Sequence, residues 1–308
     1  MKHISVLLNE TIDSLNIKED GIYVDCTLGY AGHSSAILKR LKKGKLYAFD
    51  QDSEARKHSE NVLSQISNNY EIIPCNFVNL KEELNKRGIE QIDGAIFDLG
   101  VSSPQLDNKE RGFSYHEDAR LDMRMDKDNK LDAYYVVNNY SLNDLTRIFR
   151  DYGEDKFAYQ IAKKIVNERE KKKIETTLEL VEVIKSAVPE KERRKKHPAK
   201  QIFQAIRIEV NHELDVIKPA LEQALSMLTV GGRVEVITFH SLEDKIVKKY
   251  FKELTEVDEK IKGMPNIDPK YLPDFKLVVN KAIIPSEEEL ESNNRSRSAK
   301  LRIIEKIK

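Results

Sequence analysis

Three aspartates in the first hundred residues are placed to do chemistry on a ligand. Asp25, Asp50 and Asp98 each end a short apolar run that is typical of a buried strand. Phe77 lies just past a further run of this kind. Because the carboxyl ends of parallel strands meet at one edge of a sheet, we expect these four side chains to gather there. Carboxylates at such an edge accept hydrogen bonds from ribose hydroxyl groups, which suits a nucleoside ligand.

A glycine-containing turn follows the first strand and precedes a helical pattern. Gly29 and Gly32 let the backbone approach a ligand closely, and Asp50 follows about 20 residues later. The spacing is not the G-x-G-x-x-G of dinucleotide sites, so it fits an S-adenosylmethionine pocket at least as well. An ordinary strand-helix-strand turn with a surface acid is the alternative interpretation.

The loop after Asp98 is similar to the Asp/Asn/Ser-Pro-Pro-aromatic loop of amino methyltransferases. Ser102 and Pro104 lie in this loop, although only one proline is present and Gln105 stands where an aromatic residue is expected. An exocyclic amine is a poor nucleophile, and oxygen acceptors around its N–H groups together with in-line placement make it reactive. A plain surface turn explains the same residues equally well.

A stretch of arginines and aromatics follows, and it has the chemistry to hold RNA. Phe113 or Tyr115 could stack on an extruded base, while Arg111 or Arg124 could hold a phosphate. The alternative is that the aromatics anchor this segment to a core.

Basic clusters at 163–173, 193–200 (ending at Lys200) and 295–302 also suit phosphate contacts, although charge runs on helices are usually solvated faces. For His33 and His240, at strand-to-helix turns, capping or packing is the favoured role over catalysis.

Strands alternate with helices up to residue 106, which predicts an α/β fold with a doubly wound parallel sheet. Residues 107–201 show helical runs and no convincing strand, and the α/β pattern resumes at 202. We therefore predict one domain from 1–106 and 202–308, with 107–201 as a helical insertion that recognises the substrate. Thr176 and Glu179 form a predicted capping box that opens a helix in this insertion.

The composition describes a globular protein with a heavily charged surface. The 308 residues are 40% hydrophobic and 34% charged, with zero net charge, so any nucleic-acid footprint must be local. Cys26 and Cys75 form no metal-ligand pattern and indicate a reducing compartment. No apolar run is long enough to span a membrane, and a cytoplasmic protein is expected.

Eight motifs, in order along nearly the whole chain, resemble the bacterial ribosomal small-subunit methyltransferase H family, formerly called MraW. They are His3–Leu8, Thr27–Ser34, Asp98–Asp107, Arg111–Ser114, Leu121–Asp126, His197–Lys200, Phe239–Asp244 and Arg295–Arg302.

The resemblance implies a Rossmann-like class I methyltransferase that uses S-adenosylmethionine to methylate N4 of one decoding-centre cytidine in 16S rRNA. The implied partner is 16S rRNA within the small ribosomal subunit, and neither DNA nor a membrane is expected as a partner. The implied cofactor contacts are Ala31, Gly32, His33, Asp50, Phe77, Asp98 and Gln105. The chain departs from the family pattern at Ala31, where glycine is commoner, and at Arg120, where proline often stands.

The resulting hypothesis gives Asp50 to the ribose, Phe77 to the adenine and Asp98 to the methionine end or the target amine. The predicted catalytic residues are Asp98, Ser102, Ser103 and Pro104, and the predicted RNA contacts are Arg111, Phe113, Tyr115, Arg124 and Lys200. No metal is required for the transfer, and no general base can be named. The rival functions are a non-catalytic ribosome-assembly factor, a DNA amino methyltransferase and a nicotinamide dehydrogenase.

Overall fold

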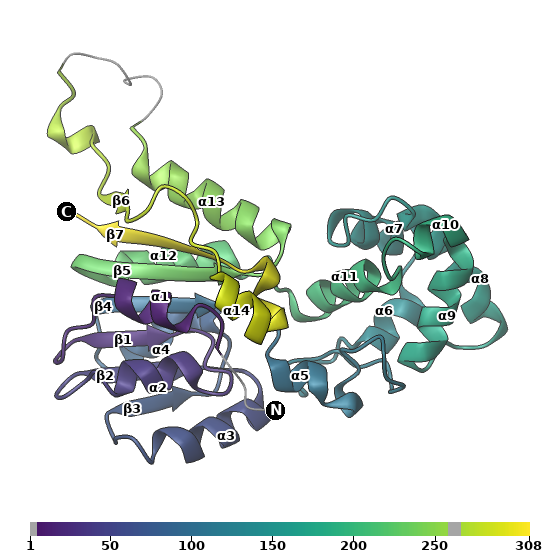
Figure 1. Cartoon of the computed structure of the whole chain (residues 1–308), viewed down its shortest axis with the longest axis horizontal. Coiled ribbons are helices and arrows are strands. Elements are labelled where there is room, and N and C mark those ends of the chain that lie inside the picture. Colours follow the sequence, from purple (N-terminus) through teal and green to yellow (C-terminus); the bar gives the residue numbers. More distant parts are fainter. Residues whose placement is uncertain (1–4, 258–265) are drawn as a thin grey trace. The chain divides into compact units, whose positions relative to one another are not determined.

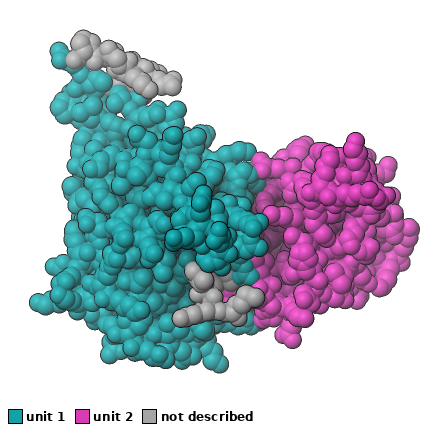
Figure 2. All heavy atoms as spheres, in the orientation of Figure 1, with its two compact units in different colours: residues 1–100, 214–308 teal, residues 101–213 magenta. Residues whose placement is uncertain are grey.

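The computed structural model describes residues 5–257 and 266–308, apart from the side chain of Ser103. The chain forms two compact units, and Figure 2 colours each one separately. Unit 1 comprises residues 1–100 and 214–308, and unit 2 comprises residues 101–213.

Unit 1 is built on one mixed sheet in the order β3-β2-β1-β4-β5-β7-β6 (Figure 1). Its strands are β1 Ile22–Asp25, β2 Lys45–Phe49, β3 Tyr70–Ile73, β4 Ile92–Asp98, β5 Leu228–Thr238, β6 Phe275–Leu277 and β7 Lys300–Lys306. The pairs from β3 through β5 are parallel, whereas β7 runs antiparallel to both β5 and β6. The predicted α/β class and doubly wound sheet are confirmed.

Helices cover both faces of this sheet, because successive side chains of a buried parallel strand point to opposite faces. Alternate strand residues pack under α1 Leu8–Ser14, α2 Gly32–Leu38 and α3 Ser53–Leu63. The intervening residues pack under α4 Leu80–Lys86, α12 Ile217–Met227 and α13 Ser241–Thr255. A short helix, α14 Glu287–Ser292, precedes β7.

Three features mark the carboxyl-terminal part of unit 1. Pro219 lies inside α12, because proline is tolerated in the first helical turn, whose N–H groups have no helical partner. Helix α12 ends at Met227, and Leu228 begins β5 directly after it. The edge strand β6 ends at Leu277, and an isolated bridge joins Ile283 to Leu301 further along.

Unit 2 is helical, as predicted, and contains no strand within its described residues. Its helices are α5 Ser103–Asp107, α6 Ala133–Asn139, α7 Leu142–Asp151, α8 Ala158–Lys171, α9 Thr177–Ala187, α10 Glu190–Arg193 and α11 Ala199–Asn211. The predicted capping box is confirmed, since Thr176 and Glu179 bond each other's backbone at the start of α9. One apolar core joins these helices.

The boundary of the second unit differs from the predicted 107–201. Helix α11 was assigned to the first domain, but its apolar face, including Ile202, Ile206 and Val210, is buried in the core of unit 2. An amphipathic pattern shows that a helix has a buried face, and it does not show which core buries it. The units therefore divide at residues 100 and 213.

None of the described helices is long and apolar enough to cross a membrane.

Candidate active site

The strand order reverses between β1 and β4, and this is where open α/β sheets bind their ligands. The chain runs from β1 outward to β2 and β3 on one side, then crosses to β4 and continues to β5 on the other. Asp25 ends β1 and Asp98 ends the neighbouring β4, so both acids lie at the reversal, at the carboxyl edge of the sheet. The predicted gathering of acids at this edge holds within unit 1.

Asp25 is a buried anchor beneath the glycine turn. Only 1% of this residue is exposed, and its carboxylate accepts hydrogen bonds from the Ser34 hydroxyl at 2.6 Å and from the Thr27 N–H at 3.0 Å. Burial raises the pKa of Asp25 to about 6, against these hydrogen bonds, which lower it. These bonds tie the end of β1 to the start of α2.

Asp50 joins the glycine turn to the end of β2. Its Oδ2 accepts from the Gly29 N–H at 2.9 Å and its Oδ1 from the Asp52 N–H at 2.8 Å. Burial raises the pKa of Asp50 to about 7, while both hydrogen bonds lower it. A carboxylate offers about four lone pairs, so capacity remains for the two hydroxyl groups of a ribose.

The turn itself has a left-handed backbone at Gly29, with φ of 49°, and at Ala31, with φ of 63°. Ala31 is fully buried in the core, a position where the commoner glycine of the family would adopt the same φ with less strain. A side chain at Gly32 would collide with Ser5 Oγ, at 1.7 Å from the Cβ. Gly32 is therefore needed for close packing of the N-terminal segment.

His33 lies buried between the N-terminal segment and β4. Its Nε2 is 3.1 Å from the carbonyl oxygen of Val6, and its Nδ1 is 3.6 Å from Asp98 Oδ2. The contact with Val6 agrees with the packing role that the sequence analysis favoured for His33. The second contact brings the imidazole to the candidate catalytic acid.

Asp98 has the most unusual environment of the three acids. Its backbone N–H donates to Thr27 Oγ1 at 2.6 Å, which fixes the end of β4 against the turn. Among the described residues, its Oδ1 is buried without any hydrogen-bond partner. Burial, together with the carboxylates of Asp25 and Glu243, raises the pKa of Asp98 well above its usual range. An unpartnered buried acceptor of this kind is a mark of a functional site.

Phe77 follows β3 and is half-buried, with its ring packed edge-on against Phe97 at a centroid distance of 5.6 Å. Neighbouring Asn76 donates its side-chain amide to Gln51 Oε1 at 3.1 Å, linking this corner to the end of β2. The ring is thus held beside the strand that carries Asp50, as an adenine contact requires.

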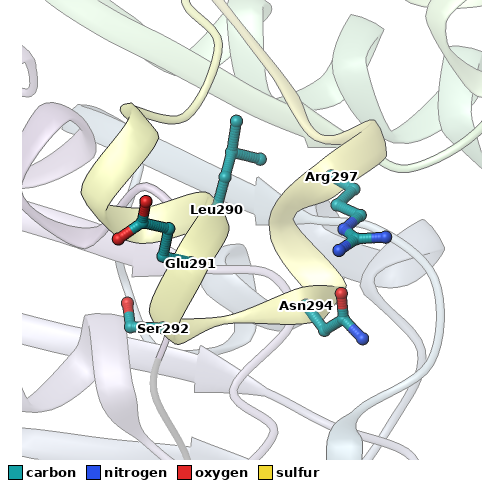
Figure 3. A pocket seen from close by; sticks show the side chains of 5 residues that line it. All are labelled: Leu290, Glu291, Ser292, Asn294 and Arg297. Carbon is teal, nitrogen blue, oxygen red and sulfur yellow. The ribbon is translucent and has the colours of Figure 1, made fainter.

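A separate hollow lies on the segment around α14 (Figure 3). Leu290, Glu291, Ser292, Asn294 and Arg297 line it. None of these residues comes from the carboxyl ends of the strands, so this hollow is not assigned as the active site.

The whole chain was then compared with known proteins. The sequence matches the MraW methylase family over residues 1–307. The chain belongs to the MraW methylase family. The Ribosomal RNA small subunit methyltransferase H of Exiguobacterium sibiricum is 56% identical over 308 residues, which cover 100% of this chain and 99% of that protein. The family supports S-adenosylmethionine as the cofactor, as the sequence predicted.

Solved structures show weaker likeness to this methylase. An rRNA methylase from Streptococcus thermophilus is 15% identical, with a TM-score of 0.46 and 100% of both chains covered. A SAM-dependent O-methyltransferase from Thermotoga maritima is 11% identical, with a TM-score of 0.41, 100% of this chain and 68% of that chain covered. These scores are too low to add support for the fold, which the strand order of the methylase carries by itself.

The predicted cytosine loop of the methylase forms the start of unit 2. Ser102 caps α5, since its Oγ accepts from the Gln105 N–H at 3.4 Å while Gln105 Oε1 accepts from the Ser102 N–H at 3.0 Å. Pro104 sits in the first turn of this helix, where its missing N–H costs nothing. The Ser103 side chain lies outside the described part of the structure. Catalytic roles for these residues, and a cofactor role for Gln105, stay predictions.

Three of the predicted RNA contacts make internal contacts within unit 2. Phe113 is 5% exposed and lies in the core of unit 2, so it cannot stack on a base without leaving that core. Arg111 is also 5% exposed and donates to the carbonyl oxygens of Arg124 and Met125 at 2.9 and 3.2 Å. Arg124 is paired with Asp122 at 2.8 Å. For Phe113 these contacts favour the alternative interpretation, in which the aromatics anchor the segment to a core. The RNA roles of the three residues stay predictions.

Tyr115 and Lys200 remain available in unit 2. Tyr115 is half-buried and stacks on His197, with ring centroids 4.7 Å apart. Lys200 is exposed at the start of α11 and forms no ion pair with any described residue. Both stay predicted RNA contacts.

The sequence did not single out Ser34, Thr27 or Glu243, which hold the site together. Glu243 is 1% exposed and accepts from the N–H groups of Phe239 and His240 at 2.7 and 3.2 Å, which closes the turn between β5 and α13. His240 is the N-cap of this helix, and Glu243 is its third helical residue. An acid three residues after a strand-to-helix turn is the sequence signal that could have identified Glu243.

Proposed function

We propose that this protein transfers a methyl group from S-adenosylmethionine to N4 of one cytidine in the decoding centre of 16S rRNA, position 1402 in the customary numbering of that RNA. Family membership over residues 1–307 supports the methylase activity. The relative from Exiguobacterium sibiricum, named for the small-subunit ribosomal RNA, supports the substrate. We propose that the enzyme works in the cytoplasm, where that RNA is found.

The side chains at the strand ends fit the cofactor by their chemistry. Asp50 keeps acceptor capacity for the ribose hydroxyls, and Phe77 offers a half-buried ring for the adenine. When bound, S-adenosylmethionine supplies an electrophilic methyl group beside the site. We infer that the backbone of Ala31, Gly32 and His33 lies along the cofactor.

The single observation that carries the reaction is the unpartnered, buried Oδ1 of Asp98 at the point where the strand order reverses. An acceptor there can take a hydrogen bond from an N–H of the target amine, which favours its rehybridisation during attack. Pre-organisation is provided by Thr27, which fixes the backbone of Asp98. Unit 2, with Tyr115 and Lys200, is proposed to hold the RNA.

The test is to offer labelled S-adenosylmethionine with three acceptors: small ribosomal subunits from cells that lack the enzyme, free 16S rRNA, and DNA. We expect label in the subunits, with less or none in DNA. Label in DNA alone would indicate a DNA amino methyltransferase. Tight cofactor binding with no label in any acceptor would indicate a non-catalytic assembly factor and overturn the proposal.

A further inference from the structure

A continuous series of polar contacts in unit 1 leads from the C-terminal segment to Asp98. Glu289 Oε1 in α14 accepts from the Leu7 N–H at 2.9 Å. The carbonyl oxygen of the preceding Val6 contacts His33 Nε2 at 3.1 Å, and His33 Nδ1 faces Asp98 Oδ2 at 3.6 Å. The two chain ends therefore converge on the histidine beside the candidate catalytic acid.

The first contact of His33 decides which ring nitrogen carries hydrogen. A carbonyl oxygen only accepts, so Nε2 must be the donor to Val6. In a neutral imidazole the other nitrogen is then bare, and here that nitrogen is Nδ1, the one that faces Asp98. The backbone of Val6 thus sets the tautomer, as a second hydrogen bond commonly does for functional histidines.

The surroundings of Asp98 favour a proton on its carboxyl group. This carboxyl group faces three titratable groups, which are Asp25 from β1, Glu243 from α13 and His33 from α2. Two of these groups are acids, and Oδ1 of Asp98 is buried without a hydrogen-bond partner among the described residues. Burial and both acids raise the pKa of Asp98, so its carboxylate is a stronger base than an exposed one and can take a proton from the ligand. In the tautomer set by Val6, Nδ1 of His33 carries the lone pair that can then receive this proton.

We propose that Asp98 and His33 form a proton relay, in which Asp98 takes the proton from the target amine and His33 Nδ1 receives it. This inference rests on the proposed function, and it adds the proton acceptor for that reaction. Asp98 is then a catalytic residue, and His33 acts through it.

The proposed step balances in atoms and charge. The cytosine N4 lone pair forms the new N–C bond while the S–C bond of the methyl donor breaks and its electron pair stays on sulfur. The N–H bond then breaks, its electron pair stays on N4, and an O–H bond forms on the Asp98 carboxylate. Transfer of this proton to Nδ1 leaves a carboxylate beside a charged imidazole. The 3.6 Å separation is long for such a transfer, but catalytic hydrogen bonds are often long before the ligand binds.

Glu289 is the remote positioning residue of this relay. Leu7 has a left-handed backbone, with φ of 51°, which is unfavourable for a leucine unless its surroundings impose it. The bond from its N–H to Glu289 is one restraint, and full burial of the Leu7 side chain is another. Loss of the Glu289 carboxylate should loosen Val6 and with it the tautomer of His33.

The first experiment is ¹⁵N NMR of the histidine side chains in the full-length protein without ligand. We expect His33 to show a protonated Nε2 and a bare Nδ1 at neutral pH, with a titration that changes in Asp98→Asn. Glu289→Gln should keep this spectrum because the amide retains an oxygen acceptor, whereas Glu289→Leu should perturb it. A protonated Nδ1 with a bare Nε2 in the wild type would overturn the relay, whatever the substrate proves to be.

The second experiment is the pH dependence of methyl transfer in His33→Gln. The glutamine Nε2 can still donate to Val6 but offers no titratable nitrogen, so fold and cofactor binding should persist. We expect the maximal rate to fall about 100-fold, the lower end of general-base effects. The rising limb of the pH profile should move to lower pH, because the pair loses one of its two proton sites. If His33→Gln is slower but the rising limb of its pH profile stays where it is in the wild type, His33 has a structural role only and the relay is wrong. Methyl transfer by the wild-type protein in the same assay shows that such a result is not a failure of the proposed function.

Discussion

The N–H of Gly29 donates a 2.9 Å hydrogen bond to Oδ2 of Asp50, so the glycine turn is joined directly to the end of β2. The acid both shapes the turn and faces the position proposed for the ribose. A substitution at Asp50 is therefore expected both to change the shape of the glycine turn and to remove the proposed ribose contact.

We predict that Asp50→Asn weakens S-adenosylmethionine binding about 10- to 100-fold, the range expected for losing a hydrogen bond to a charged group. Its amide nitrogen cannot accept from the N–H groups that Asp50 now satisfies. Wild-type affinity should also fall as the pH drops below about 7, because protonation removes acceptor capacity from this carboxyl. Isothermal titration calorimetry at pH 6 and pH 8 measures both effects.

The control is Asp52→Asn. Asp52 caps α3 by accepting from the Glu54 N–H at 3.0 Å, and asparagine caps helices equally well. Unchanged cofactor affinity in this variant and a loss in Asp50→Asn would assign the ribose contact to Asp50. Equal losses in both variants would contradict that assignment.

The buried side chain of Glu235 should make the folded state less stable at alkaline pH. It is 1% exposed in the middle of β5, and neither carboxylate oxygen has a hydrogen-bond partner among the described residues. Burial raises the pKa of Glu235 to about 8. Between the unfolded pKa and this value the folded state holds a proton that the unfolded state has lost, so stability falls as the pH rises through that window.

We expect Glu235→Gln to be more stable than the wild type at pH 9, by on the order of 3 kcal/mol, and nearly equal to it at pH 5. Urea unfolding at the two pH values measures the difference. Glu305→Gln is the matched control with opposite sign, since Arg233 and Lys276 lower the pKa of Glu305. A Glu235→Gln difference that does not change with pH would refute the interpretation.

Arg111 should matter for stability and not for RNA. Its guanidinium satisfies two carbonyl oxygens, so Arg111→Ala leaves buried acceptors unpaired and should cost about 1–3 kcal/mol. Lys109→Ala, which removes only an exposed pair with Glu117, should cost about 0–1 kcal/mol. Thermal unfolding compares them. If Arg111→Ala has the thermal stability of the wild type but binds rRNA weakly, Arg111 contacts an RNA phosphate and this interpretation is wrong.

Lys200 should contribute to RNA binding through charge alone. Lys200→Ala should weaken binding of 16S rRNA and reduce the slope of log affinity against log salt by about 1, as expected for one lost phosphate contact. Cofactor affinity should not change. Lys248→Ala, an exposed lysine on α13, is the control. A salt slope identical to that of the wild type in Lys200→Ala would remove this residue from the interface.

Strands β1, β2 and β4 were predictable because each is a short apolar run closed by an acid. Asp25 and Asp98 end β1 and β4 as predicted, because burial on both faces of the sheet leaves few other interpretations of such apolar runs. Asp50 was predictable for the same reason. The local sequence was sufficient to predict these acids, because each one directly follows or ends an apolar strand.

The rest of the site depends on packing between distant segments. Nothing near His33 in the sequence indicates that Val6 orients its ring, or that Glu289 fixes the turn before it. Arg111 looks like a surface charge until the carbonyl groups that it satisfies are known. Such contacts join residues far apart in the chain, and no periodicity records them.

The most direct test of the central claim is to identify the methylated nucleoside. Small subunits from cells lacking the enzyme would be treated with wild-type protein or Asp98→Asn, digested to nucleosides and analysed by mass spectrometry, with cofactor binding of both proteins measured in parallel. We predict N4-methylcytidine with the wild type, and at least a 100-fold lower yield with Asp98→Asn despite retained cofactor binding. A different methylated nucleoside, or an unchanged yield from Asp98→Asn, would contradict the account.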